Sequence, residues 1–318
     1  MKRLILAAAA AISLVIPAIV AAPAQAQQPL GIGTMGQGTL GYAMGAAIAT
    51  VMQEKAGLQS RIQPASGTSS YLPLIDRGEL DFGIANILEA REAMITGTRK
   101  LENLRFASVL FPFRVGLFVK KDSDAKTIAD LKGKRITYGY SSQATIEDVI
   151  DGLLANGGVA RADVRRVLVP NVVRGADDFA AGKVDAAFFA IGGGKVAEVD
   201  ASVGGIRFIP LSDSADAVAR MTKFVPGSYI TTVAPRNGLA GIDQPTTAMA
   251  YDYVLITGKH VPDATIAKAL AALADNKAAL VSALAAFAAF EKERMAKSID
   301  LPVHPGARAY FDKAGLKS

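Results

Sequence analysis

Residues 29–45 read PLGIGTMGQGTLGYAMG, and the placement of their glycines decides between two kinds of fold. Gly31, Gly33 and Gly36 match the spacing G-x-G-x-x-G of dinucleotide-binding folds. That motif needs a complete strand before its first glycine and an acidic residue at the end of the next strand. The flanking sequence therefore has to be tested against both requirements.

Neither requirement is met. Only residues 27–30 precede the first glycine once an N-terminal leader is set aside, and Glu54 falls in a segment with helical spacing. We therefore predict that the first two glycines lie inside the opening strand, and that residues 34–41 form a glycine-rich loop that leads into a helix. Such a loop presents backbone N–H groups to an anion, although a tight turn without a ligand has the same sequence pattern.

The first 26 residues have the three parts of a secretory signal peptide: Lys2 and Arg3, an apolar run, and small residues at 24 and 26. An uncleaved membrane anchor is the alternative, because the apolar run is nearly long enough to span a bilayer. Pro17 and the small-residue ending favour cleavage. The chain has no cysteine, so no lipid anchor is attached there, and we predict an untethered periplasmic protein of a Gram-negative bacterium.

Composition argues against several classes of function. Without cysteine and with only His260 and His304, the chain lacks ligands for a zinc-type site, and we predict no metal and no cofactor. Both histidines lie in loop-like segments, so triad chemistry is disfavoured. The net charge of +6 is spread along the chain, and no basic run alternates with aromatic residues, so we expect no nucleic-acid partner.

The order of predicted elements indicates an α/β protein with two lobes. Apolar strand-like runs alternate with helix-like segments, which predicts parallel sheets covered by helices. The 292 residues that follow the leader exceed what one core usually supports. A regular apolar stripe predicts one long final helix capped by Asp263, with its core-facing positions at Ile266, Leu270, Leu273, Leu280, Leu284, Phe287 and Met295.

At family level, the chain resembles the TAXI family, the periplasmic solute-binding subunits of TRAP transporters. The resemblance covers nearly all of the mature chain and depends on five segments in order. These are GIGTMGQGTLGYAMGAAIA, SGTSSYLPLIDRGELDFGIAN, TIADLKGKRITYG, AAGKVDAAFF and LPVHPGARAYF.

The resemblance implies a type II periplasmic-binding-protein fold with hinge strands between two lobes. It also implies a small carboxylate, dicarboxylate or acidic amino acid as ligand, and TRAP-type permease subunits as membrane partner. We predict a signal peptide at 1–26, a first lobe of 27–113 plus 236–318, and a second lobe of 114–235. Relatives often carry two tyrosines where this chain has Gly41-Tyr42, and many have a proline- and glycine-rich loop at 140–143, so the ligand itself is not transferred.

Ligands of open parallel sheets bind beyond the carboxyl ends of the strands. In this chain the rule selects residues 34–39, 66–71 and 86–89 of the first lobe, and 140–145, 171–174 and 189–193 of the second. Ser69 and Thr145 have helix capping as an equal alternative. From these loops we predict ligand contacts by Thr34, Gln37, Gly38, Thr39, Thr68, Ser69, Tyr71, Asn86, Tyr140, Ser142, Gln143, Thr145, Arg174 and Phe189.

A carboxylate is held best by the planar fork of an arginine. Arg114 lies among apolar residues in the crossover segment FPFRVGLF, where it is aimed into the cleft or paired with a buried acid. Arg174 is the second candidate, with a solvated loop arginine as its alternative. Tyr71, Tyr140 and Phe189 pack either against the ligand or within a lobe. Lys195 and Glu198 are interpreted as surface residues.

These observations predict a non-enzymatic solute receptor that closes on a small organic anion. An ABC-type or sensor-linked receptor is the alternative within the binding class. A periplasmic enzyme on the same scaffold is the alternative from another class, and it would depend on residues such as Glu89 or Lys195.

Overall fold

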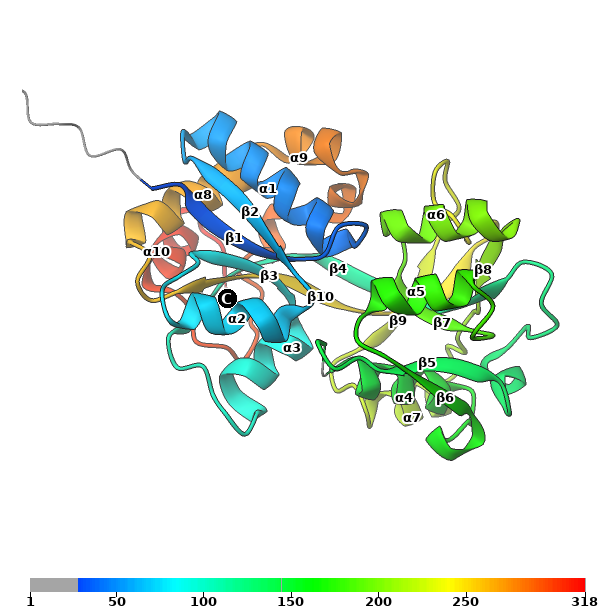
Figure 1. Cartoon of the computed structure of the whole chain (residues 1–318). Helices are drawn as coiled ribbons and strands as arrows, with labels where there is room; N and C mark the ends of the chain where they lie inside the picture. The colour runs from blue at the N-terminus through cyan, green and yellow to red at the C-terminus, as the bar shows by residue number, and fades with distance from the viewer. Residues whose placement is uncertain (1–27, 144, 318) are drawn as a thin grey trace, which may run out of the picture.

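Two α/β lobes are joined by a pair of long strands, β4 (Leu104–Lys120) and β10 (Thr246–Gly258), which run through both of them (Figure 1). The computed structural model describes residues 28–143 and 145–317, so the predicted signal peptide lies outside the described residues. Within that described part, no helix is long and apolar enough to cross a membrane. The predicted two-lobed α/β class is confirmed.

The first lobe has the strand order β2-β1-β3-β10-β4. Its first three strands are parallel, and β10 pairs with β3 in the antiparallel sense. Its elements before β4 are β1 (Leu30–Met35), α1 (Leu40–Ala56), β2 (Ser60–Ala65), α2 (Thr68–Asp76), β3 (Phe82–Asn86), α3 (Ile87–Arg91) and a π-helical turn (Glu92–Thr96).

The opening glycines are required by packing. Gly31 and Gly33 lie inside β1, as predicted, and a Cβ atom on either would lie 2.6 Å from a side-chain atom of Leu80 or Tyr71. The loop after β1 leads into α1, whose end is marked by Gly57 at φ +60°. The G-x-G-x-x-G spacing therefore reflects close contact between β1 and its own lobe, not a dinucleotide site.

The second lobe mixes parallel and antiparallel strands, so the expectation of a purely parallel sheet does not hold for it. β5 pairs in parallel with β6 and, through Ile136, with Ala186 just before β7, whereas β7 and β8 pair antiparallel with β4, and β9 pairs antiparallel with β10. The reason is that β4 and β10 cross between the lobes in opposite directions, so they meet their neighbours antiparallel. The strands are β5 (Arg135–Gly139), β6 (Arg165–Val169), β7 (Ala187–Ala190), β8 (Ile206–Phe208) and β9 (Tyr229–Val233).

Helices cover both faces of this lobe (Figure 1). They are α4 (Ile146–Asn156), α5 (Val172–Ala180), α6 (Gly194–Val203) and α7 (Ala215–Thr222), with 3-10 turns at Ile128–Leu131 and Arg161–Asp163.

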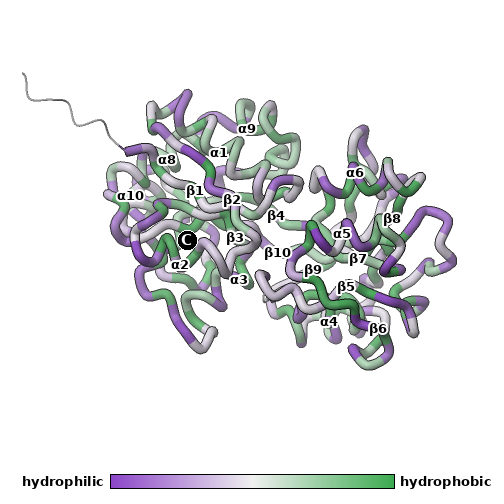
Figure 2. Tube along the Cα trace, in the orientation of Figure 1, coloured by the Kyte–Doolittle hydropathy of each residue, from purple (hydrophilic) through white to green (hydrophobic). Residues whose placement is uncertain are grey.

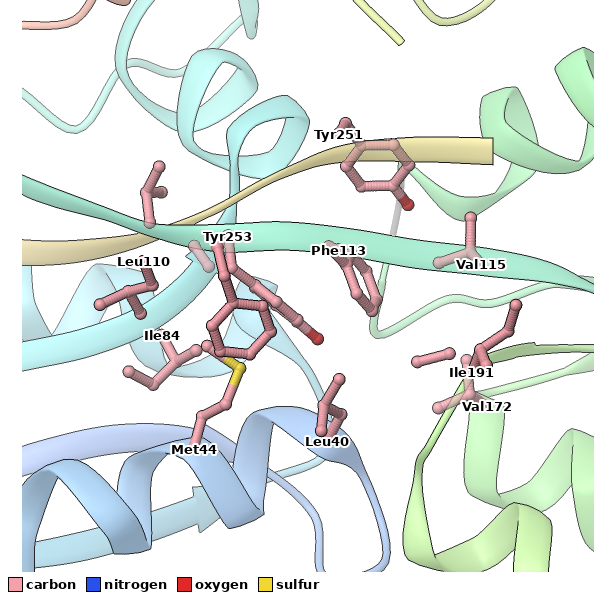
Figure 3. Packing of buried hydrophobic residues seen from close by; sticks show 14 of the residues in the cluster. Leu40, Met44, Ile84, Leu110, Phe113, Val115, Val172, Ile191, Tyr251 and Tyr253 are labelled. Carbon is pink, nitrogen blue, oxygen red and sulfur yellow. The ribbon is translucent and has the colours of Figure 1, made fainter. Parts of the chain in front are cut away.

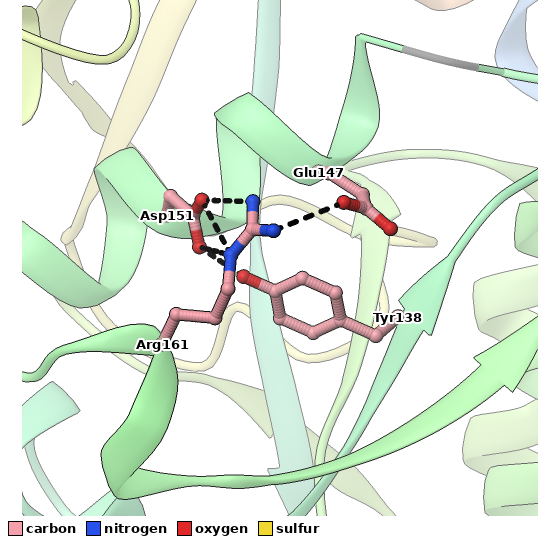
Figure 4. Close-up of polar contacts among 4 residues, drawn as sticks. All are labelled: Tyr138, Glu147, Asp151 and Arg161. Carbon is pink, nitrogen blue, oxygen red and sulfur yellow. Dashed lines mark hydrogen bonds and ion pairs between the residues drawn. The ribbon is translucent and has the colours of Figure 1, made fainter.

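An ion-paired cluster fastens α4 to the rest of the second lobe (Figure 4). The Arg161 Nε donates to Oδ2 of Asp151 at 3.0 Å, and the Arg161 Nη1 lies 3.4 Å from Oε2 of Glu147. The Tyr138 hydroxyl of β5 donates to the same Asp151 carboxylate. Because Asp151 is buried, these donors replace the water that it loses on folding.

The two crossing strands are irregular where they leave the first lobe. Pro112 of β4 lies opposite Asp252 of β10, and the register shifts by one residue beside this pair. A proline has no N–H to donate, so a bulge is a place where a strand tolerates it. The buried Asp252 is ion-paired with Arg294 at 3.1 Å and with Lys297.

The segment after residue 235, which the sequence analysis assigns to the first lobe, forms hydrogen bonds with the second lobe. Gly241 O accepts from Phe208 N, and Thr247 O accepts from Leu211 N, so this segment is bonded to the second lobe. We therefore propose that the second lobe extends beyond residue 235 to the part of β10 that pairs with β9.

The predicted long final helix is wrong, although most of its apolar stripe is buried. Asn276 interrupts it, and its amide donates to Ala272 O at 2.8 Å, which satisfies a carbonyl at the helix end. Asp263 is the first helical residue and makes no side-chain cap. This segment instead forms α8 (Asp263–Asp275), α9 (Lys277–Ala283) and 3-10 turns at Ala285–Ala289 and Lys292–Arg294. The last helix of the chain, α10 (Pro305–Lys313), follows it.

Both histidines contact nearby groups of the protein itself. His304 caps α10, and its Nδ1 accepts from Gly306 N at 3.1 Å, while His260 Nε2 lies 3.3 Å from Asp81 Oδ1. Apolar segments run through the interior of both lobes, and hydrophilic segments lie on the outer helices and loops (Figure 2).

Candidate functional site

The two lobes touch through loops at the ends of their strands. Gly67 of the first lobe packs so closely on the second that an added Cβ would lie 1.9 Å from Ser142 O. Its φ of 179° is ordinary extended backbone, so the glycine is required by this contact alone. A second contact is a hydrogen bond from Lys195 N to Gly38 O, at 2.9 Å. The lobes therefore touch in this structure, and we call this the closed arrangement.

A pocket of about 330 Å³ opens beside these contacts, and we call it the cleft pocket. Both lobes contribute to it, and four of the predicted ligand contacts lie in its wall. The lining residues are Met35, Gly36, Gln37, Thr39, Ser66, Gln143, Asn171, Val172, Val173, Arg174 and Asp177.

Two helices begin at the cleft pocket, one from each lobe. Thr39 caps α1, and its Oγ1 accepts from Tyr42 N at 3.1 Å. Asn171 caps α5, and its Oδ1 accepts from Arg174 N at 2.9 Å. Helix N-termini carry partial positive charge and free N–H groups, so the wall of this pocket favours an anion from two sides.

Gln143 connects the two sides of the pocket. The side chain is fully buried, and its Oε1 accepts from Val172 N at 2.9 Å. Its Nε2 faces the first lobe, 3.9 Å from the sulfur of Met35. A thioether is a weak acceptor, so the amide retains donor capacity for a better partner.

The ionised groups of the cleft pocket are already paired. Arg174 Nε lies 3.2 Å from Asp178 Oδ1, and Asp177 Oδ1 lies 2.7 Å from Lys195 Nζ. The Lys195 side chain is only 11% exposed, so its interpretation as a surface residue is wrong. Its second partner Glu198 is exposed, as expected.

Arg114 lies in β4 opposite Ala250 of β10, and Tyr229 of β9 lies on the other side of Ala250. Arg114 is not part of the cleft-pocket wall. Its Nε is buried without a hydrogen-bond partner. Burial lowers the pKa of the guanidinium, the nearby Tyr229 opposes this, and the like charge of Arg236 lowers the pKa further. No acid pairs with Arg114 among the described residues.

Two further predicted contacts carry buried hydroxyls without partners. Thr34 Oγ1 lies at the end of β1, and Thr145 Oγ1 lies at the start of α4. Thr145 occupies the capping position but makes no capping bond, so that alternative does not account for its hydroxyl. Together with Arg114, they are three predicted residues that keep hydrogen-bonding capacity in buried surroundings.

The aromatic residues on the predicted list lie in the lobe cores. The Tyr71 hydroxyl donates to Ile84 O, and the Tyr140 hydroxyl donates to Thr137 Oγ1 at 2.6 Å. Phe189 is 1% exposed. Ser69 lies in the first turn of α2, after the capping position at Gly67, so it is not the capping residue. Together with Thr68 it lines a separate surface pocket.

Sequence reasoning missed the apolar residues that face the interlobe space. In Figure 3, Leu40 and Phe113 point toward Val172 and Ile191 across the gap, and all four are less than 10% exposed. Three of them lie directly beside or within the selected loops, and this adjacency is the signal that could have identified them.

A buried carboxyl, that of Glu89, joins two of the cleft loops. Glu89 accepts from Thr68 Oγ1 at 2.8 Å and from Asn86 N at 3.3 Å, while Asn86 caps α3 in return. Burial raises the pKa of Glu89 to about 7, against the two hydrogen bonds, and the charge of Glu92 adds to the rise. The carboxyl therefore changes charge near neutral pH.

Comparison with known proteins gives a family and a fold. The sequence matches the NMT1-like family over residues 32–315. It does not single out the TAXI family, which stays a prediction. A binding protein component of an ABC phosphonate transporter from Pseudomonas aeruginosa superposes with a TM-score of 0.52 at 14% identity, over 83% of this chain and 80% of that chain. An ancestral arginine-binding protein bound to glutamine gives 0.52 at 17% identity, over 81% and 97%.

Replacement of Gly67 by alanine should prevent closure without unfolding either lobe. The new methyl group would overlap Ser142 O, and the lobes relieve that overlap by moving apart. We expect a larger radius of gyration in small-angle scattering and a loss of folding stability below about 1 kcal/mol. Gly36→Ala is the control, since its added Cβ would meet no atom nearer than 3.8 Å. An unchanged radius for Gly67→Ala would contradict the closed contact.

The raised pKa of Glu89 predicts a pH-dependent stability. The folded state binds this proton more tightly than the unfolded state, so the contribution of Glu89 is largest in acid and is lost as pH rises toward 7. Between pH 5 and 8, the unfolding free energy of the wild type should fall by about 2–3 kcal/mol relative to Glu89→Gln. Urea titrations at both pH values measure this. A parallel pH response of the two proteins would disprove it, and exposed Glu54→Gln is the control.

Proposed function

We propose, from the premise that this chain belongs to the NMT1-like family of the periplasmic solute-binding type, that it is an extracytoplasmic receptor for a small organic anion. The observation that carries the proposal is the cleft pocket between the N-termini of α1 and α5, one from each lobe. An anion in this pocket contacts both lobes at once, and it therefore stabilises their closed arrangement.

The composition of the cleft pocket favours binding over turnover. Arg174 and Asp177 are the only ionisable residues in its wall, and both are ion-paired. Neither is free to act as a nucleophile or as a general base. We therefore propose a receptor and not an enzyme. Donors for the anion are the Gln143 amide and those N–H groups at the two helix starts that are not already bonded to Thr39, Asn171 or Gln143.

For the membrane partner we favour an ABC-type importer over the TRAP-type permease that the sequence resemblance implies. The support is the similarity of this fold to the binding component of an ABC phosphonate transporter. Uptake of the ligand into membrane vesicles of the source organism measures the difference. It should require ATP hydrolysis and persist without a sodium gradient, and the reverse result would restore the TRAP assignment.

The anion itself is found by thermal shift. Carboxylates, dicarboxylates, acidic amino acids and phosphonates are screened against the mature chain. At least one should raise the melting temperature progressively with concentration. At one hundred times its Kd, the ligand should add about 2.7 kcal/mol to the unfolding free energy. A complete screen without any shift would count against an organic-anion receptor.

Gln143→Glu provides the sharper test with any anion that binds. The substitution keeps the acceptor for Val172 N but places a negative charge in the pocket wall. Repulsion and the lost donor should weaken binding at least about 100-fold, measured by calorimetry. Gln53→Glu, on the exposed side of α1, adds the same charge far from the pocket and should leave the affinity unchanged. Equal affinity of both variants would place the anion elsewhere.

A further inference from the structure

A second and larger groove opens between the lobes, and none of its lining residues belongs to the cleft pocket. Its volume is about 670 Å³. The first lobe contributes α3 and the π-helical turn, and the second contributes the start of α4 and the segment 224–227 after α7. In Figure 1, α3 and α4 lie on the lower side of the gap between the lobes. We call this the lower groove.

The lower groove carries negative charge that the protein does not neutralise. Glu92 of the first lobe and Asp148 of the second line it, and within the described chain neither has a cationic side chain within 4.0 Å. The two cations of the wall are already used, since Arg91 lies 3.8 Å from Asp300 and Lys297 pairs with Asp252. Both carboxylates line this one groove, and burial and the charge of Asp148 raise the pKa of Glu92.

A buried hydroxyl and an apolar wall accompany these carboxylates. Thr145, in the turn that precedes Asp148, is 9% exposed, and its Oγ1 has no partner although it lines the groove. Ile87 and Leu88 supply apolar surface from the first lobe. Phe224 of the second lobe is 46% exposed, one of two large apolar side chains that the described chain leaves open.

We propose that the lower groove binds a small organic cation, a primary ammonium on an apolar body. The ammonium lies between Glu92 and Asp148, and it donates a further hydrogen bond to the Thr145 hydroxyl. The apolar body lies on Ile87, Leu88 and Phe224, whose ring face also attracts the positive charge. Since the walls come from both lobes, the cation binds the closed arrangement and favours it, as the anion does in the cleft pocket.

The test compares two probes of equal shape, phenethylamine and the neutral 2-phenylethanol, titrated calorimetrically into the mature chain at about pH 8. The amine should bind at least about tenfold more tightly than the alcohol. Asp148→Asn and Glu92→Gln should each weaken the amine about fivefold, the size of an exposed ion pair, and leave the alcohol unchanged. Phe224→Ala should weaken both probes, which places them in the groove.

Glu147→Gln is the matched control. Glu147 lies in the same turn of α4 as Asp148, but it faces Arg161 and does not line the groove. It should leave the amine affinity unchanged. A loss of affinity equal to that of Asp148→Asn would show that the amine responds to the net charge of the protein and not to the groove. Equal binding of amine and alcohol, an amine affinity insensitive to both carboxylate variants, or no amine binding at about 10 mM would each overturn the proposal. None of these outcomes bears on the anion in the cleft pocket.

Discussion

The antiparallel pairing of β4 with β10 is the constraint on which the rest of the molecule depends. These two strands are the only backbone pair that is continuous through both lobes of the described chain, and each joins the sheet of one lobe to that of the other. Pairing along their length fixes which strand ends face one another. The bulge beside Pro112 and Asp252 interrupts this pairing, and bulges of this kind bend a strand and increase its local twist.

The closed arrangement depends on small contact surfaces between the two lobes. The lobes meet where Gly67 reaches Ser142 and where Gly38 accepts from Lys195. Neither contact has a side chain that would hold the lobes together strongly by itself. In the proposed function, a ligand that contacts both lobes adds to these two contacts and stabilises the closed form further.

Four residues that the sequence analysis selected line the cleft pocket, but the bonding of their side chains was not foreseen. Thr39 and Gln143 lie in the cleft pocket. Their loops could be selected from the sequence because turn signals locate the ends of strands in an α/β sheet. Arg174 lies there too, but its charge is matched by Asp178, a partner one helical turn away that the sequence analysis did not consider. Tyr71 lies in α2 and Phe189 in β7, and both rings turn into their own lobes. The Tyr71 ring fills the space that Gly33 and Gly83 leave, and the Phe189 ring packs against Gly193.

Local pattern by itself determined the class of fold and the opening strand with its two packed glycines. These features depend on residues near one another in the chain. Tertiary structure alone decided that the Lys195 ammonium lies 2.7 Å from Asp177, and that Glu92 and Asp148 line one groove from opposite lobes. The reason is common to both: each depends on which distant segment lies opposite, and periodicity along one chain carries no information about that partner.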